Sequence, residues 1–219
     1  MELPNRDREE EAITLLLLTV FEEWERDLLR VGYIPWEAYR LRVQTILTAR
    51  LAAVFLFMVL LFAREKKFQV DNEATTAFAL GWAGIRAGMV ANNLKASVQQ
   101  AYNVAINAFY GDGRVSLREL LSGLLDRSRA STIATTEVTQ AQSAGNIRAV
   151  QEFQQQSGIA LEGVWITELA AFGRSTKPGD GGVCPICFPL HAQPRAVWGD
   201  RFPLGPPAHP NCRCHLEFQ

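Results

Sequence analysis

The sequence has no cysteine before residue 184 and no histidine before residue 191. It also lacks a P-loop, a GxGxxG turn and a GxSxG elbow, the short motifs of nucleotide-binding and acyl-transfer enzymes. With only three histidines, all near the C-terminus, a Ser/His/Asp arrangement would have to be built around the cysteine-containing segment. These absences weigh against an enzyme, and we expect no catalytic residues.

A basic surplus is missing as well. The 219 residues hold 22 Lys and Arg against 23 Asp and Glu, a net charge of −1, whereas a general nucleic-acid binder is usually basic. The charged N-terminus, MELPNRDREEEA, does not have the basic-then-apolar pattern of a secretory signal. We therefore expect a reducing compartment, where clustered cysteines bind metal more often than they form disulfides.

Most of the chain has helical periodicity. Apolar side chains recur at three- and four-residue steps between Ile13 and Leu29, and Gly32 and Pro35 then interrupt the pattern. A second helix is predicted from Trp36 to about Lys67. A third is predicted to follow an N-cap at Asp71 or Asn72 and to continue through small residues that permit close helix packing; the glycines among them make a break conceivable.

An uncharged run of thirteen residues, Leu51 to Ala63, lies inside the second predicted helix. A spanning helix needs about 20 apolar residues, so a buried or interface helix is favoured over membrane association. We expect no stable membrane span.

The C-terminal half changes in character. Ser116 and Glu119 match a capping box, and residues 130–156 suit a long polar helix on which Glu137 is expected to be solvated. After Gly158, residues 161–169 have the β-branched pattern of a strand, and residues 212–218 suit a closing strand. The predicted fold is mainly α, with a helical domain at 1–129 and a small α+β module at 130–219.

The strongest local signal is a pair of two-residue spacings. Cys184 and Cys187 form CPIC, while His209 and Cys212 form HxxC about 20 residues later, a spacing near that of zinc ribbons and fingers. These four residues are the first choice for a tetrahedral zinc site. Zinc here would be structural, because a module of about 60 residues buries little apolar area.

Other ligand sets and other states of the cysteines stay open. Cys214 is the first alternate ligand, because residues 212 and 214 of an extended chain share a face; His191 and His215 are further candidates. Reduced thiols in a small core, or disulfides, compete with zinc. A catalytic zinc would need an open position and a general base, and Glu168 and Asp180 sit in no such motif.

The C-terminal third resembles the phage head morphogenesis, or Mu F-like minor head protein, family. The family pattern is matched by Thr136-Glu137, Ala141 and Asn146, then by Trp165, the cysteine pair, and the ending PPAHPNCRC at residues 206–214. Two positions depart from the pattern: Thr135 stands where an arginine is frequent, and Ala192 stands where a glycine is usual. The resemblance covers roughly residues 130–219.

This resemblance implies a minor capsid protein, present in few copies, that helps head assembly, genome packaging or genome ejection. The implied location is the capsid interior at the portal vertex of the virion, after assembly in the host cytoplasm. The implied partners are the portal and major capsid proteins, with packaged DNA and further copies of the chain as additional contacts, and residues 1–129 would dock on them.

Some relatives in this family carry a toxin domain after the module, and we expect none here, since the sequence ends at Gln219. Two alternative functions remain. The first is a zinc-dependent hydrolase or nuclease, and the second is a membrane-active ejection protein that uses Leu51 to Ala63.

Overall fold

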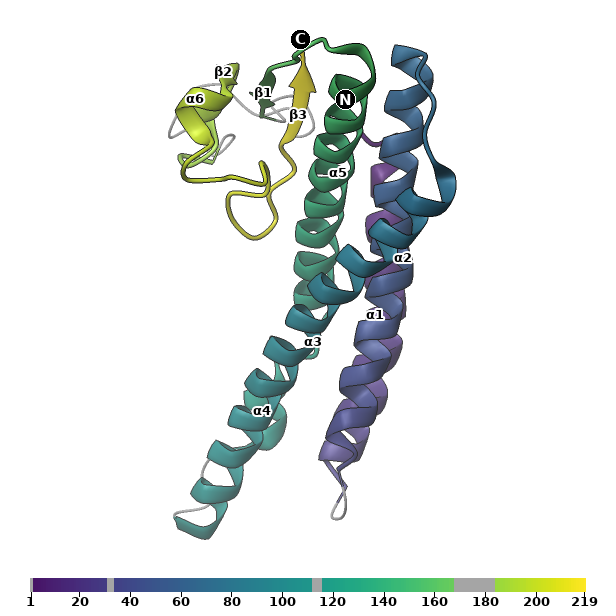
Figure 1. The fold of residues 1–219 in the computed structure, drawn as a ribbon. Coiled ribbons are helices and arrows are strands. Elements are labelled where there is room, and N and C mark those ends of the chain that lie inside the picture. Colours follow the sequence, from purple (N-terminus) through teal and green to yellow (C-terminus); the bar gives the residue numbers. More distant parts are fainter. Residues whose placement is uncertain (1, 31–33, 112–115, 168–183) are drawn as a thin grey trace. The chain divides into compact units, whose positions relative to one another are not determined.

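The computed structural model describes residues 2–30, 34–111, 116–167 and 184–219 (Figure 1). The fold is mainly α with a small three-stranded antiparallel sheet near the C-terminus, as predicted. The helices are α1 (Arg6–Leu28), α2 (Trp36–Lys66), α3 (Asn72–Gly111), α4 (Leu117–Leu121), α5 (Arg127–Ser157) and α6 (Arg195–Trp198), with a 3-10 turn, η1, at Phe188–Leu190. The strands are β1 (Gly163–Ile166), β2 (Gln193–Pro194) and β3 (His215–Phe218).

Most helix boundaries follow the predicted signals. The Ala74 amide donates to Asp71 Oδ1 at 3.0 Å, so Asp71 caps α3. This helix then continues unbroken through its glycines. Gly158 adopts a φ of +70° and ends α5, because glycine enters the left-handed region without a Cβ penalty.

The predicted capping box is wrong. Ser116 precedes α4, but its side chain makes no capping hydrogen bond, and α4 is a single turn of five residues. Gly123, with a φ of +83°, lies just beyond the C-cap Ser122. A left-handed glycine at this position terminates a helix, so the apolar positions that follow do not extend it.

Two compact units make up the chain, and both draw on segments far apart in sequence. The first contains Met1–Arg6, Leu51–Ala79 and Thr135–Gln219, and the second contains Asp7–Arg50 and Leu80–Ala134. This division runs across the predicted domains 1–129 and 130–219, whose boundary stays a prediction.

An aromatic cluster joins α1 and α2 in the second unit. Trp24 is fully buried, stacks on Tyr39 with ring centroids 5.2 Å apart, and meets Trp36 edge-on at 6.2 Å. From α3, the second unit receives mostly small buried side chains, namely Ala83, Ala87, Ala91, Leu94, Val98, Ala101 and Ala105. Their spacing keeps one narrow face of α3 in the core.

Replacing Tyr39 with phenylalanine tests how this cluster is tied to α1. The Tyr39 hydroxyl donates to Asp27 Oδ2 at 2.6 Å. Burial, followed by this carboxylate, raises the pKa of Tyr39 from 10.0 to about 12. The raised pKa contributes stability that is complete below pH 10 and is lost as the pH rises to about 12. We expect Tyr39→Phe to cost about 1 kcal/mol near neutral pH and to remove this alkaline loss.

Urea denaturation of both proteins across the alkaline range measures the effect. Parallel curves of the free energy of unfolding against pH for wild type and Tyr39→Phe would contradict it, because the two proteins differ only at residue 39.

The apolar run lies in the first unit, on the second half of α2. Its buried positions are Leu51, Ala52, Val54, Phe55, Met58, Val59, Phe62 and Ala63, which agrees with the predicted buried helix. Phe57 and Leu60 remain about half exposed, at 45% and 49%. By length and composition α2 is long and apolar enough to cross a membrane, but half of its most apolar window is buried within the protein.

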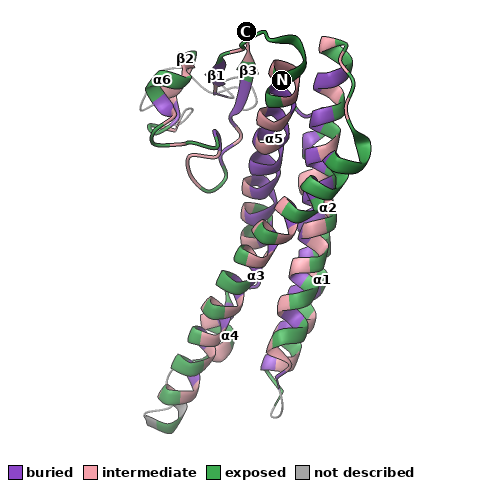
Figure 2. Ribbon diagram, viewed as in Figure 1, coloured by how far each residue is buried: buried purple, intermediate pink, exposed green. Residues whose placement is uncertain are grey.

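Helix α5 has neighbours on two sides within the first unit. Toward α2, Gly145 lies against Phe55, and Phe153 meets Phe62 edge-on at a centroid distance of 6.3 Å. Toward the C-terminal segment of the chain, Thr136 Oγ1 accepts a hydrogen bond from the Asn211 amide. Burial on both sides explains why much of the helix is purple in Figure 2.

The polar composition of α5 therefore does not mean a solvated helix. Its buried polar residues are Thr135, Glu137, Thr139, Gln140, Gln142, Ser143 and Asn146. The prediction that Glu137 is solvated is wrong, since only 3% of this residue is exposed. A helix enclosed on two faces buries polar side chains that the hydrophobic pattern alone would place in water.

The sheet brings the two cysteine-containing segments together. Its strand order is β2-β1-β3, and Trp165 of β1 is opposite both Gln193 of β2 and Leu216 of β3. Both predicted strands are present. The closing strand is shorter than expected, since β3 begins only at His215. The predicted end of the first strand, 168–169, lies outside the described residues.

Candidate metal centre

The Cys184–Cys187 segment forms a tight turn around its first sulfur. The amides of Cys187 and Phe188 both donate to the Cys184 carbonyl, at 3.1 and 3.0 Å. The Ile186 amide lies 3.4 Å from Cys184 Sγ and donates to it. These hydrogen bonds fix the position of Cys184 Sγ relative to Cys187.

The His209–Cys212 segment forms a second turn. The Cys212 amide donates to the His209 carbonyl at 3.2 Å, and Asn211 adopts a φ of 61°, a left-handed conformation that asparagine tolerates. His209 Nδ1 lies 2.7 Å from the Pro210 carbonyl. Because a carbonyl can only accept, Nδ1 carries the proton, which leaves the lone pair of Nε2 for a metal.

The two turns bring five donor atoms together in two overlapping groups. One group holds Cys184, Cys187 and His209, the other holds Cys187, Cys212 and Cys214, and within each group the donors lie within 4.8 Å of one another. Cys187 Sγ is 3.1 Å from His209 Nε2 and 3.7 Å from Cys212 Sγ. Tetrahedral metal–thiolate bonds of about 2.3 Å place sulfurs about 3.8 Å apart. The cluster can therefore hold a metal ion.

The remaining histidines do not join either group. The Thr167 amide donates to His191 Nδ1 at 3.1 Å, so this ring anchors the end of the β1 segment. His215 is buried on β3, with Nε2 3.5 Å from Glu217 Oε1. Burial lowers the pKa of His215. Each first-choice ligand and the alternate Cys214 thus belongs to one of the two groups, although neither group contains all four first-choice ligands, and the alternates His191 and His215 belong to neither.

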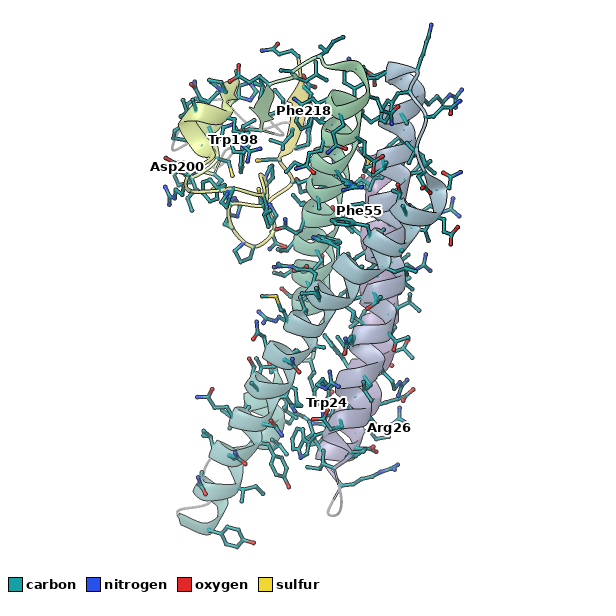
Figure 3. All side chains as sticks on the ribbon, in the orientation of Figure 1. Trp24, Arg26, Phe55, Trp198, Asp200 and Phe218 are labelled. Carbon is teal, nitrogen blue, oxygen red and sulfur yellow. The ribbon has the colours of Figure 1, made fainter. Side chains whose placement is uncertain are left out.

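Three of the four cysteines also belong to the small core of the module. Cys187, Cys212 and Cys214 are buried, while Cys184 is only partly buried, and all four are free thiols. Their apolar neighbours include Trp165 of β1 and Trp198 of α6, whose rings meet at 5.7 Å and 64°. Trp198 is labelled in Figure 3. The sulfurs that could hold a metal ion are therefore also part of the packed core of the module.

The buried thiols shift one another's pKa values in opposite directions. Hydrogen bonds from Cys187 and Cys214 lower the pKa of Cys212. The pKa of Cys187 is raised by its hydrogen bonds with the other two thiols and by burial. For Cys214, hydrogen bonding with Cys187 lowers the pKa, but the effects of Cys212 and of burial prevail and raise it to about 12. A divalent cation would replace the protons that these sulfurs retain.

The backbone of the second turn is held by α5 and by the N-terminal segment. Thr139 Oγ1 donates to the Cys212 carbonyl, Thr136 Oγ1 accepts from the Asn211 amide at 3.1 Å, and buried Arg6 donates to the Arg213 carbonyl at 3.0 Å and to Thr139 Oγ1. Sequence reasoning missed Arg6 and Thr139. They lie 207 and 73 residues from the carbonyls that they bind, and no spacing rule links such distant positions.

The two carboxylates weighed for catalysis, Glu168 and Asp180, lie outside the described residues. Comparisons of the chain with protein-family models, with curated proteins and with solved structures found no match.

Proposed function

We propose that this chain is a minor head protein of a tailed phage that binds near the portal vertex and assists head assembly or genome packaging and delivery. The observation that carries the proposal is the hydrogen bond between the Asn211 amide and Thr136 Oγ1. It joins the Thr-Glu helix to the PPAHPNCRC ending, the two halves of the pattern that resembles the family. A chance match of separate motifs would give no reason for such contact.

The remaining positions of the pattern support the same proposal. Trp165 and the buried cysteines form one core, and Ala141 and Asn146 are fully buried on α5. The resembling residues therefore act as a structural unit.

We further propose that the metal is zinc and that its role is structural. Thiolate and imidazole donors suit zinc, which takes four protein ligands in structural sites. The first-choice set is Cys184, Cys187, His209 and Cys212. Four protein ligands leave no position for a reactive water, which argues against the hydrolase or nuclease alternative. The membrane-active alternative likewise stays a prediction.

Copurification with the portal protein encoded in the same genome tests the proposed function. The tagged full chain should retain the portal protein from a lysate that contains both, and it should be found in purified particles in fewer copies than the major capsid protein. A matched tagged chain with Leu80→Glu and Ile85→Glu, which alters two exposed apolar positions of α3, reports whether the helical part contributes. Absence from particles together with no portal binding would contradict the proposal.

A further inference from the structure

The metal centre holds five donors, whereas a tetrahedral ion takes four. The predicted set uses Cys184, Cys187, His209 and Cys212. Exchanging Cys184 for Cys214 gives a second set of three thiolates and one imidazole. Both sets keep Cys187, which belongs to both groups of donors.

We propose that Cys214 is a reserve ligand that replaces Cys184 on the metal when Cys184 is modified. This inference rests on the proposed zinc site and adds a regulation of it. The ion would move from the group nearer the surface toward the buried group while it stays bonded to Cys187. His209 Nε2, 3.1 Å from Cys187 Sγ, and Cys212 Sγ, 3.7 Å from it, are placed to follow.

Exposure separates the two exchanging thiols. Cys184 is partly exposed, whereas only 4% of Cys214 is exposed. A reagent in solvent therefore reaches Cys184 first. A particle that leaves the reducing cytoplasm meets oxidants, and hydrogen peroxide is the co-reactant of the proposed modification.

The proposed reaction has two steps, oxidation of Cys184 and exchange of the ligand, and atoms and charge balance in each. The Cys184 thiolate attacks one peroxide oxygen, so that an S–O bond forms, the O–O bond breaks and hydroxide leaves; sulfur is oxidised and peroxide is reduced. The resulting sulfenic acid is a weaker ligand than the thiolate. Cys214 then gives its proton to the hydroxide, forming water, and its thiolate takes the vacated position on the ion.

Three variants of the full chain test the exchange: Cys184→Ser, Cys214→Ser and the double variant. Zinc per chain is measured by mass spectrometry after dialysis against a weak chelator. Both single variants should keep about one zinc per chain, as in the wild type, because four donors remain in each, whereas the double variant should bind about 100-fold more weakly. With cobalt in place of zinc, Cys184→Ser should retain the wild-type intensity of thiolate-to-metal charge transfer.

Each other result overturns the proposal. Loss of zinc in Cys184→Ser alone, or a drop of one thiolate in its cobalt spectrum, would mean that Cys214 does not replace it, while the zinc site itself stands. Retention of zinc by the double variant would mean that neither thiol is a ligand. A wild-type chain without zinc would instead reject the zinc site on which the inference rests, so the two failures are distinguishable.

Discussion

Cys187→Ser is expected to lose the metal and the ordered C-terminal module together. Cys187 is the one donor shared by the two groups, so without it the remaining donors fall into two separate pairs, Cys184 with His209 and Cys212 with Cys214. A structural zinc contributes on the order of 10–16 kcal/mol over its four ligands. One lost ligand therefore costs about 3 kcal/mol, or about a 100-fold weaker affinity.

The effect should be local to the module. The described part of the sheet comprises only short strands around Trp165, Trp198 and the buried sulfurs, so it has little other apolar area to stabilise it. Hydrogen exchange should lose protection at Gly163–Ile166 and His215–Phe218, while α1 stays protected. Cys184→Ser is the matched control and should keep both zinc and protection.

Chelator competition gives the affinity and amide exchange gives the structural effect. Wild-type zinc affinity in Cys187→Ser would contradict the central position of Cys187. Equal loss of zinc in Cys184→Ser and Cys187→Ser would leave Cys187 essential but remove the difference between the two thiols.

Gly145→Ala and Gly81→Ala should change stability in opposite directions. A Cβ at Gly145 would lie 2.6 Å from the Phe55 carbonyl oxygen and 3.0 Å from Met58 Cβ. The first contact is with backbone, so α5 must move away from α2, at a cost of about 1–3 kcal/mol. At Gly81 a Cβ would meet nothing within 4 Å, and alanine gains up to about 1 kcal/mol from helix propensity.

Guanidinium denaturation followed by circular dichroism measures both changes. The comparison is informative because the same substitution is made in two long helices. If Gly145→Ala were as stable as the wild type, the close approach of α2 and α5 would be wrong.

The helices were predictable because their boundaries depend on local chemistry. The break at Pro35, the Asp71 cap and the stop at Gly158 each act within one or two turns of the chain. The failure of the capping box is also local, since the Ser116 side chain makes no capping hydrogen bond and the left-handed Gly123 follows the end of α4 after one turn.

The burial of α5 was not predictable from its composition. A polar helix is usually a surface helix, whereas α5 packs on α2 through Gly145 and Phe153 and is hydrogen-bonded to the second turn through Thr136. Partners that lie far apart in sequence are not visible to a periodicity argument.

The site was predictable in its donors but not in their grouping. Two-residue spacings place pairs of donors on one side of a turn, which identified Cys184, Cys187, His209 and Cys212. Cys214 joins the cluster because of the path that the chain takes from the second turn into β3. The anchors Arg6 and Thr139 depend on tertiary contacts, so no motif indicates them.

Zinc-edge X-ray absorption of the purified full chain is the direct test of the proposed closed structural zinc site. We expect one zinc with three sulfurs at about 2.3 Å, one nitrogen at about 2.0 Å and no water ligand. A zinc that carries a water oxygen would contradict the closed site and favour the hydrolase or nuclease. A folded chain that binds no zinc would contradict the structural role of the metal altogether.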